Sequence, residues 1–246
     1  MSHAVESTQV VTFNIEGRTY EGTSGENLIE AVRRYGYEVP SLCHHEAVQA
    51  YGACRLCLVE VVDKKGHKTI TTSCNFPLQA GIDVLLNSET VLKHRRMIME
   101  LHLAMVPNST ELKELAASMG VTKSRFSKEE GDCILCGLCE RVCREVVGQS
   151  ALVSQGRGTK KIIGPPHDEA SNCIACGACA FVCPVKCINV TDKDGMRTID
   201  RWKRTLELAR CEKSGRRFTP SFLLTSAKER QPNMSSDLIK KAPPYR

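Results

Sequence analysis

Three runs of cysteines constrain this chain more than any other feature of its sequence. They hold twelve of its fourteen cysteines, four in each run. Thiolates are the soft ligands that iron-sulfur clusters need, and tight C-x2-C spacing favours metal over disulfides. The sequence therefore predicts a protein that holds iron-sulfur clusters and conducts electrons. The runs are Cys43, Cys54, Cys57 and Cys74; Cys133, Cys136, Cys139 and Cys143; and Cys173, Cys176, Cys179 and Cys183.

The second and third runs share the spacing C-x2-C-x2-C-x3-C and align position by position, which indicates a duplicated half-domain. In this spacing the first three cysteines wrap one cubane 4Fe-4S cluster, and the fourth ligates the other cluster. Zinc is the alternative, but zinc sites usually pair two short knuckles that lie far apart. We expect one cluster on Cys133, Cys136, Cys139 and Cys183, and its twin on Cys173, Cys176, Cys179 and Cys143.

The first run is spaced differently, with ten residues between Cys43 and Cys54. Its four thiolates fit a 2Fe-2S cluster at one end of a sheet. His44 and His45 are alternative ligands of the Rieske type, although four cysteines make histidine ligation unnecessary. We expect surface or supporting roles for both histidines.

Two cysteines, Cys187 and Cys211, lie outside the runs. We expect each to be a packed or free thiol and not a ligand. Cys211 begins a segment that looks like half a zinc knuckle, with Ser214 where a second cysteine would stand. Half a site does not bind zinc.

Residues 8–88 have the pattern of a β-grasp domain that contains one cysteine-bearing loop. Alternating apolar residues around Glu16 and Gly17 predict a tight hairpin. Thr23 followed by Glu26 is a capping-box pattern, which predicts the start of a helix. Further strands are predicted over residues 56–62, 68–72 and 82–86.

The rest of the chain divides into three segments. Residues 89–124 repeat apolar residues at helical spacing and form a helical connector that Pro107 interrupts. Residues 125–200 form a two-cluster 4Fe-4S ferredoxin domain of the bacterial type, with one hairpin between its halves and another after Cys187. Residues 201–246 hold twelve Lys or Arg against four Asp or Glu. We expect a basic tail that docks on a partner or stays mobile. Removal of residues 213–246 should weaken assembly and leave the iron content intact. The predicted fold class is α+β.

Net charge and hydropathy exclude several classes of protein. The formal charge of +6 treats every cysteine as neutral. Each four-thiolate cluster brings about −2, so the loaded protein is near neutrality and we expect no nucleic-acid partner. The chain has neither a basic start followed by an apolar run nor eighteen consecutive apolar residues. We therefore expect no signal peptide, no membrane span and a cytoplasmic location.

With these three runs in this order, the chain resembles the iron-sulfur subunits of NAD-linked hydrogenases, electron-bifurcating ones among them. It is similar also to the N-terminal part of the large peripheral-arm subunit of respiratory complex I. The likeness covers roughly residues 8–200. It rests on PSLCHHEAVQAYGACRLCLVEV with Cys74, on VLKHRRMIMELHL and on the doubled CxxCxxCxxxC.

The chain departs from that family directly after the second of these motifs. Family members usually carry a further 4Fe-4S site there, held by one histidine and three cysteines. The segment MELHLAMVPNSTELKELAASMGV contains no cysteine, although His94 and His102 remain nearby. The resemblance therefore implies that this relay cluster is absent from the chain.

The resemblance implies an electron-transfer subunit with one 2Fe-2S cluster, two 4Fe-4S clusters and no catalytic site of its own. The sequence has no G-x-G-x-x-G after a strand and no P-loop. The implied partners are a flavin- and NAD(P)(H)-binding diaphorase subunit and hydrogenase catalytic subunits, with ferredoxin as a further partner. The alternatives are the same relay in an NAD-dependent formate dehydrogenase or complex-I-like enzyme, a free-standing ferredoxin-type carrier, and a zinc-stabilised scaffold. The basic tail favours permanent docking over a free carrier.

Overall fold

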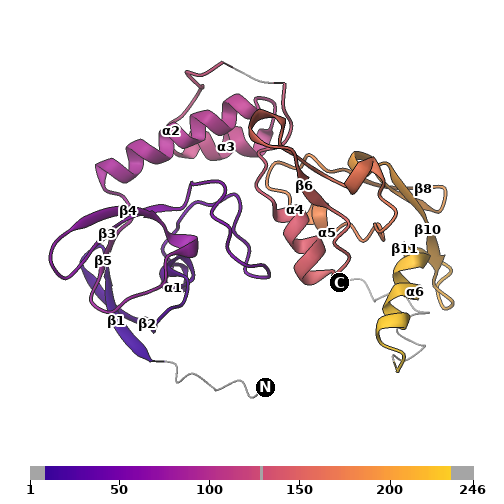
Figure 1. The fold of residues 1–246 in the computed structure, drawn as a ribbon, viewed down its shortest axis with the longest axis horizontal. Coiled ribbons are helices and arrows are strands. Elements are labelled where there is room, and N and C mark those ends of the chain that lie inside the picture. The colour runs from indigo at the N-terminus through magenta and orange to yellow at the C-terminus, as the bar shows by residue number, and fades with distance from the viewer. Residues whose placement is uncertain (1–8, 128–129, 234–246) are drawn as a thin grey trace. The chain divides into compact units, whose positions relative to one another are not determined.

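The computed structural model describes residues 9–127 and 130–233, which divide after Cys136 into two compact units (Figure 1). The first unit holds strands β1 to β5 and helices α1 to α3, and the second holds β6 to β11 and α4 to α6. The strands are β1 Val10–Ile15, β2 Arg18–Thr23, β3 Leu58–Val62, β4 Lys68–Thr72, β5 Asp83–Leu85, β6 Val153–Gln155, β7 Ile162–Gly164, β8 Val190–Lys193, β9 Met196–Ile199, β10 Arg204–Arg210 and β11 Arg217–Pro220. The helices are α1 Leu28–Arg34, α2 Glu89–Met105, α3 Thr110–Ser118, α4 Leu138–Arg141, α5 Ala178–Phe181 and α6 Ser221–Arg230.

The first unit contains a five-stranded sheet in the order β2-β1-β5-β3-β4. Strands β1 and β5 are parallel and the other neighbours antiparallel, which is the β-grasp arrangement. The predicted hairpin is confirmed: Glu16 and Gly17 both have positive φ, as a type I′ turn between antiparallel strands requires. Phe13, Leu28 and Val59 belong to one buried core formed by the sheet and α1.

Helix α1 begins later than the capping-box pattern predicts. The Thr23 N–H does donate to Glu26 Oε1, at 2.7 Å. Strand β2 nevertheless continues to Thr23, and the helix starts only after Asn27. The Leu28 N–H is bonded to the Phe76 carbonyl oxygen. The predicted helix start was therefore wrong, because pairing with a distant segment fixes where this chain enters its helix.

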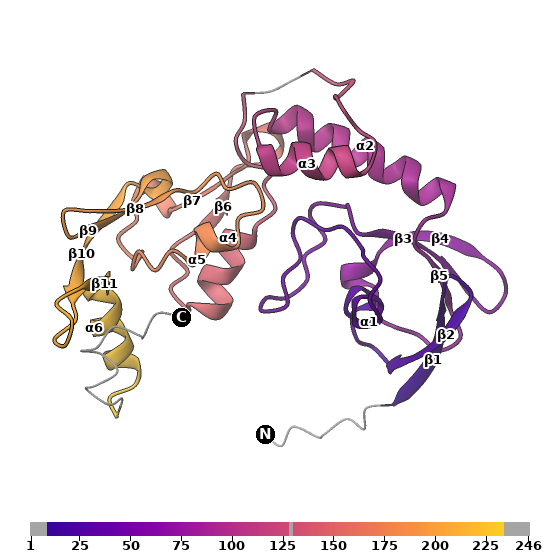
Figure 2. The same ribbon diagram turned by 180° about the vertical axis from the view of Figure 1, so that it is seen from behind.

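Helices α2 and α3 form the predicted connector and lie side by side in Figures 1 and 2. The break between them includes Pro107, as expected from the missing N–H of proline. Ser88 and Ser109 cap the two helices, and their hydroxyls accept from the N–H groups of Val91 and Leu112. Helix α2 packs against β3, which places it beside the strand that follows Cys57.

The second unit contains both predicted hairpins. Strands β6 and β7 pair between the two cysteine runs, and β8 pairs with β9 after Cys187. The described part of residues 201–246, which we expected to be a basic tail that docks on a partner or stays mobile, contains two strands and a helix. Strand β10 pairs with β9 and β11, which completes a four-stranded sheet in the order β11-β10-β9-β8, and α6 packs on β10. Residues 234–246 of the predicted tail lie outside the described residues.

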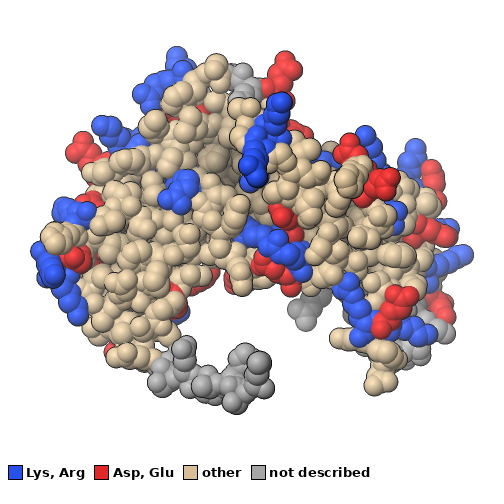
Figure 3. Space-filling view, viewed as in Figure 1, with Lys and Arg blue, Asp and Glu red and all other residues tan. Residues whose placement is uncertain are grey.

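Lys, Arg, Asp and Glu side chains of both signs are interspersed over the face of the second unit that Figure 3 shows. None of the helices in the described ranges is long and apolar enough to cross a bilayer.

Candidate iron-sulfur cluster sites

The four cysteines of the first run are all buried in the β-grasp domain, with between 0 and 2% of their surface exposed. Cys57 directly precedes β3, and Cys74 lies in the short turn after β4. These strands are antiparallel neighbours with Leu58 opposite Thr72, so both cysteines flank the same end of the sheet. Cys43 and Cys54 lie in the long loop between α1 and β3.

The thiols of this run interact in two pairs. A hydrogen bond between the side chains of Cys43 and Cys54 lowers the pKa of Cys54 and raises that of Cys43. The same interaction between Cys57 and Cys74 lowers the pKa of Cys57 and raises that of Cys74. Buried thiolates need compensating positive charge, which iron supplies. The donor set therefore fits a cluster with four thiolate ligands.

Backbone N–H groups point at the sulfur atoms of this site. The Leu42 N–H donates to Cys54 Sγ at 3.3 Å, and the Cys54 N–H donates to Cys43 Sγ at 3.4 Å. Such bonds stabilise negative charge on ligand sulfur and so tune a cluster's reduction potential.

The two neighbouring histidines have other interactions in the structure. His44 Nε2 lies 2.5 Å from Glu30 Oε1, and its Nδ1 is buried without a partner. His45 Nδ1 accepts from the Ala47 N–H at 3.2 Å. The roles proposed for these histidines stay predictions.

A pocket in the second unit gathers cysteines from both repeated runs. Cys143, the last of the second run, lines it together with Cys173, Cys176 and Cys179, the first three of the third run. The structure thus brings together the four residues that crossed ligation assigns to one cluster. The N–H groups of Ala151 and Ala175 donate to the sulfurs of Cys143 and Cys173 at 3.3 and 3.4 Å. That these four cysteines are the ligands remains our prediction.

Trp202 belongs to this pocket, and sequence reasoning missed it. Its indole Nε1–H donates to Cys179 Sγ at 3.4 Å, and the residue is 4% exposed. Burial raises the pKa of Cys179 to about 11, while the bond from Trp202 acts in the opposite direction. Trp202 is the only tryptophan of the sequence and stands at the end of the last predicted hairpin, and this position could have indicated a role near the cluster.

The repeated runs also have the same backbone geometry. Leu135 and Gly137 have positive φ in the second run, and so do Ala175 and Gly177 at the matching positions of the third. Positive φ is unusual for leucine and alanine, and is found where a loop must wrap closely around a group. The duplication predicted from the sequence is therefore present in the backbone.

The other predicted cubane set is divided between the two units. Cys133 and Cys136 end the first unit, whereas Cys139 and Cys183 lie in the second. The Leu135 N–H donates to Cys133 Sγ at 3.3 Å. Cys183 Sγ lies 3.6 Å from Cys187 Sγ, and this contact lowers the pKa of Cys183 to about 6. The assignment of this set to one cluster remains a prediction.

The remaining residues of interest are engaged elsewhere. Cys211 is buried between β10 and β11. His102 is buried on α2, and its Nε2–H donates to the Cys54 carbonyl oxygen at 2.9 Å. His94, exposed on the same helix, has its Nδ1 2.7 Å from the Thr90 carbonyl oxygen.

Comparisons with known proteins assign both cysteine-bearing regions. Residues 8–89 match the 2Fe-2S iron-sulfur cluster binding domain, and residues 132–187 match the 4Fe-4S dicluster domain. The chain is 29% identical over 202 residues to the NADH-ubiquinone oxidoreductase 78 kDa subunit of Neurospora crassa, covering 71% of this chain and 27% of that protein. It is 28% identical over 200 residues to the NADPH-Fe(3+) oxidoreductase subunit alpha of Geobacter sulfurreducens, covering 71% of this chain and 23% of that protein. The chain thus spans about a quarter of the length of these relatives.

A solved structure extends the likeness in fold over nearly the whole chain. It is the crystal structure of NAD+-reducing [NiFe]-hydrogenase in the H2-reduced state, one chain of which superposes with a TM-score of 0.63. The match covers 94% of this chain and 99% of that chain at 24% sequence identity, so it establishes the fold.

These findings define a multi-cluster iron-sulfur protein with one 2Fe-2S site and a 4Fe-4S dicluster domain. The predicted fold class and the predicted three clusters are therefore confirmed. More particularly, the chain is related to subunits of an NADH-ubiquinone oxidoreductase and of an NADPH-Fe(3+) oxidoreductase.

Proposed function

We propose that this chain is an electron-transfer subunit, which relays electrons between a flavin- and NAD(P)(H)-binding diaphorase subunit and a hydrogenase module. The end-to-end match with a chain of an NAD+-reducing hydrogenase, over 94% of one chain and 99% of the other, carries this proposal. The larger relatives contain the same region as only about a quarter of their length.

The residues of the chain hold and insulate the clusters, which supply one-electron redox chemistry when bound. The thiols of Cys43, Cys54, Cys57 and Cys74 are withdrawn from water. Backbone and indole N–H groups donate to the sulfurs of four other predicted ligands, Cys133, Cys143, Cys173 and Cys179, and such donors would stabilise the negative charge of a bound cluster. The chain therefore serves as a relay, and the substrates react on its partners.

One of the relatives favours a second candidate, the same relay in a complex-I-like enzyme, because it is an NADH-ubiquinone oxidoreductase subunit. An NAD-dependent formate dehydrogenase would use the relay in the same way. We propose a cytoplasmic location for each of these complexes, because fourteen cysteines suit a reducing compartment.

Anaerobic purification of the tagged chain with its bound partners tests the proposal. We expect a flavin-containing subunit and a hydrogenase subunit to copurify, and the complex to reduce NAD+ or NADP+ with H2. A matched complex with Cys57→Ser should keep its subunits and lose that activity. Reduction with formate, but not H2, would favour the formate dehydrogenase. A chain that purifies alone as a monomer would contradict the subunit role and support a free carrier.

A further inference from the structure

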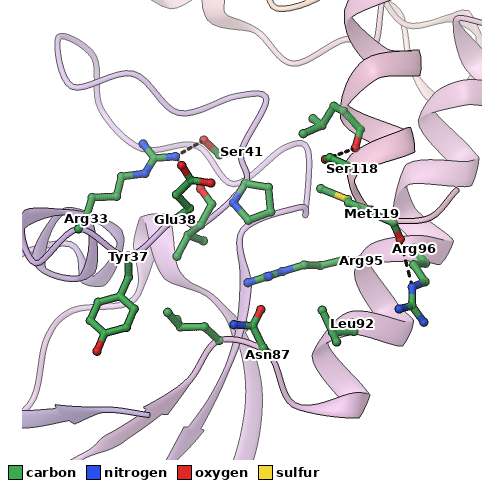
Figure 4. Close-up of a pocket in the computed structure, with 15 residues that line it drawn as sticks. Arg33, Tyr37, Glu38, Ser41, Asn87, Leu92, Arg95, Arg96, Ser118 and Met119 are labelled. Atoms are coloured by element: carbon green, nitrogen blue, oxygen red, sulfur yellow. Dashed lines mark hydrogen bonds between the residues drawn. The ribbon is translucent and has the colours of Figure 1, made fainter. Parts of the chain in front are cut away.

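Arg95 of α2 is a buried cation beside the proposed 2Fe-2S site. It is 5% exposed, and both its Nε and its Nη2 donate to the carbonyl oxygen of Leu58, with Nε at 3.1 Å. Leu58 directly follows Cys57 in the chain. Figure 4 shows Arg95 extending from α2 toward the β-grasp domain, whereas Arg96 turns to Met119, the residue directly after α3.

No carboxylate compensates the charge of Arg95. Among the described residues no Asp or Glu forms an ion pair with it, and its hydrogen bonds go to a neutral carbonyl. A buried cation without a partner is costly, and proteins normally pair it with an anion. Burial lowers the pKa of Arg95 to about 10, while the nearby Cys57 acts to raise it. The guanidinium thus remains charged near neutral pH.

A four-thiolate 2Fe-2S cluster would supply the missing anion. Such a cluster carries about −2 when oxidised and about −3 when reduced, and nearby charge is one of the levers that set its potential. Attraction to a buried cation therefore grows on reduction, and favours the reduced state.

We propose that Arg95 is the counter-charge of the 2Fe-2S cluster and raises its reduction potential. The proposal rests on Cys43, Cys54, Cys57 and Cys74 as the ligands and does not depend on which partners the chain has. Arg95 acts through its charge and does not touch iron, so it is a tuning residue.

The neighbouring Arg96 provides a matched control. It carries the same charge one residue further along α2, but it is exposed, and its Nε donates to the Met119 carbonyl oxygen at 3.2 Å. Salt screens an exposed charge efficiently and a buried one much less. The difference between the two arginines therefore isolates the effect of burial beside the site.

Redox titration of the full-length, anaerobically purified chain, followed by EPR of the 2Fe-2S signal, tests the proposal. We expect Arg95→Gln, which removes the charge and keeps a donor, to raise the oxidised-to-reduced ratio at a fixed potential at least tenfold, or about 59 mV for one electron. This shift should persist at high salt. Arg95→Lys keeps the charge and should change the oxidised-to-reduced ratio less than threefold. Arg96→Gln, measured at high salt, should also change this ratio less than threefold.

A second neutral variant, Arg95→Met, fills similar space, so the result does not depend on a single substitution that could disturb folding. If both neutral variants lose the cluster while Arg95→Lys keeps it, the charge is required for binding and the proposal stands. An intact signal with unchanged potential in Arg95→Gln or Arg95→Met would overturn it. An equal shift or loss of cluster in Arg95→Lys would do so as well. Cys57→Ser tests the ligand assignment separately, because it should abolish the 2Fe-2S signal itself.

Discussion

Replacing Trp202 by phenylalanine should lower the reduction potential of one 4Fe-4S cluster. The indole Nε1–H donates to Cys179 Sγ at 3.4 Å inside a buried pocket, and phenylalanine removes this donor while keeping an aromatic ring there. An N–H donor stabilises the more negative, reduced cluster more than the oxidised one. The sign of the shift is therefore negative.

The size of the shift follows from the strength of that hydrogen bond. Hydrogen bonds to charged groups contribute about 1.5–3 kcal/mol. Reduction takes the cluster from about −2 to about −3, so the bond gains roughly half of its strength, or about 0.7–1.5 kcal/mol. At about 59 mV for each 1.4 kcal/mol, the potential should fall by about 30–60 mV.

An EPR-monitored redox titration measures this shift, and the other two clusters of the same sample serve as internal controls. Iron content should stay unchanged, because Trp202 is not a ligand. A Trp202→Phe chain with full iron content and three unaltered potentials would refute the reasoning. A shift confined to the 2Fe-2S cluster would also refute it, because it would place Trp202 near the wrong site.

Three further predictions address the second unit and the β-grasp core. Cys143→Ser should abolish the EPR signal of the cluster on the third run, and Cys183→Ser that of the other cubane; loss of the opposite clusters would contradict crossed ligation. Contrary to the expectation from the sequence, deleting residues 213–246 should lower the iron content, because Arg230 of α6 donates to the carbonyl oxygens of Val147 and Gly148, close to Cys143 in the chain; full iron content would show that α6 is dispensable. Phe13→Ala should reduce the free energy of unfolding by about 3–5 kcal/mol, since Phe13 is 1% exposed, whereas the exposed Val10→Ala should change it by less than about 0.5 kcal/mol in urea titrations.

The cysteine spacing predicted the fold of the second unit well because three of the four predicted ligands of each cubane lie within seven residues of sequence. The four cysteines of each repeated run fit within eleven residues, so a local pattern specifies a local loop. The hairpin at Glu16 and Gly17 and the break at Pro107 are local in the same sense. Each of these features could therefore be predicted without knowledge of distant contacts.

The features that the sequence did not predict depend on contacts between distant residues. Strand β10 has a weak local signal, with Leu206 and Leu208 alternating with polar residues, but its pairing with β9 and β11 decides its structure. Helix α6 buries none of its residues, so it packs against β10 without a buried apolar stripe. The bond from Trp202 to Cys179 joins residues 23 positions apart. Because of these contacts, residues 201–233, which we expected to belong to a tail, are part of the second unit.

Iron and acid-labile sulfide per chain, with EPR of the reduced protein, test the central claim most directly. One 2Fe-2S and two 4Fe-4S clusters require about ten irons and about ten sulfides per anaerobically purified chain. The reduced protein should give one slowly relaxing signal and two interacting, fast-relaxing signals. About fourteen irons would mean a fourth cubane, and zinc in place of iron would contradict the electron-transfer account altogether.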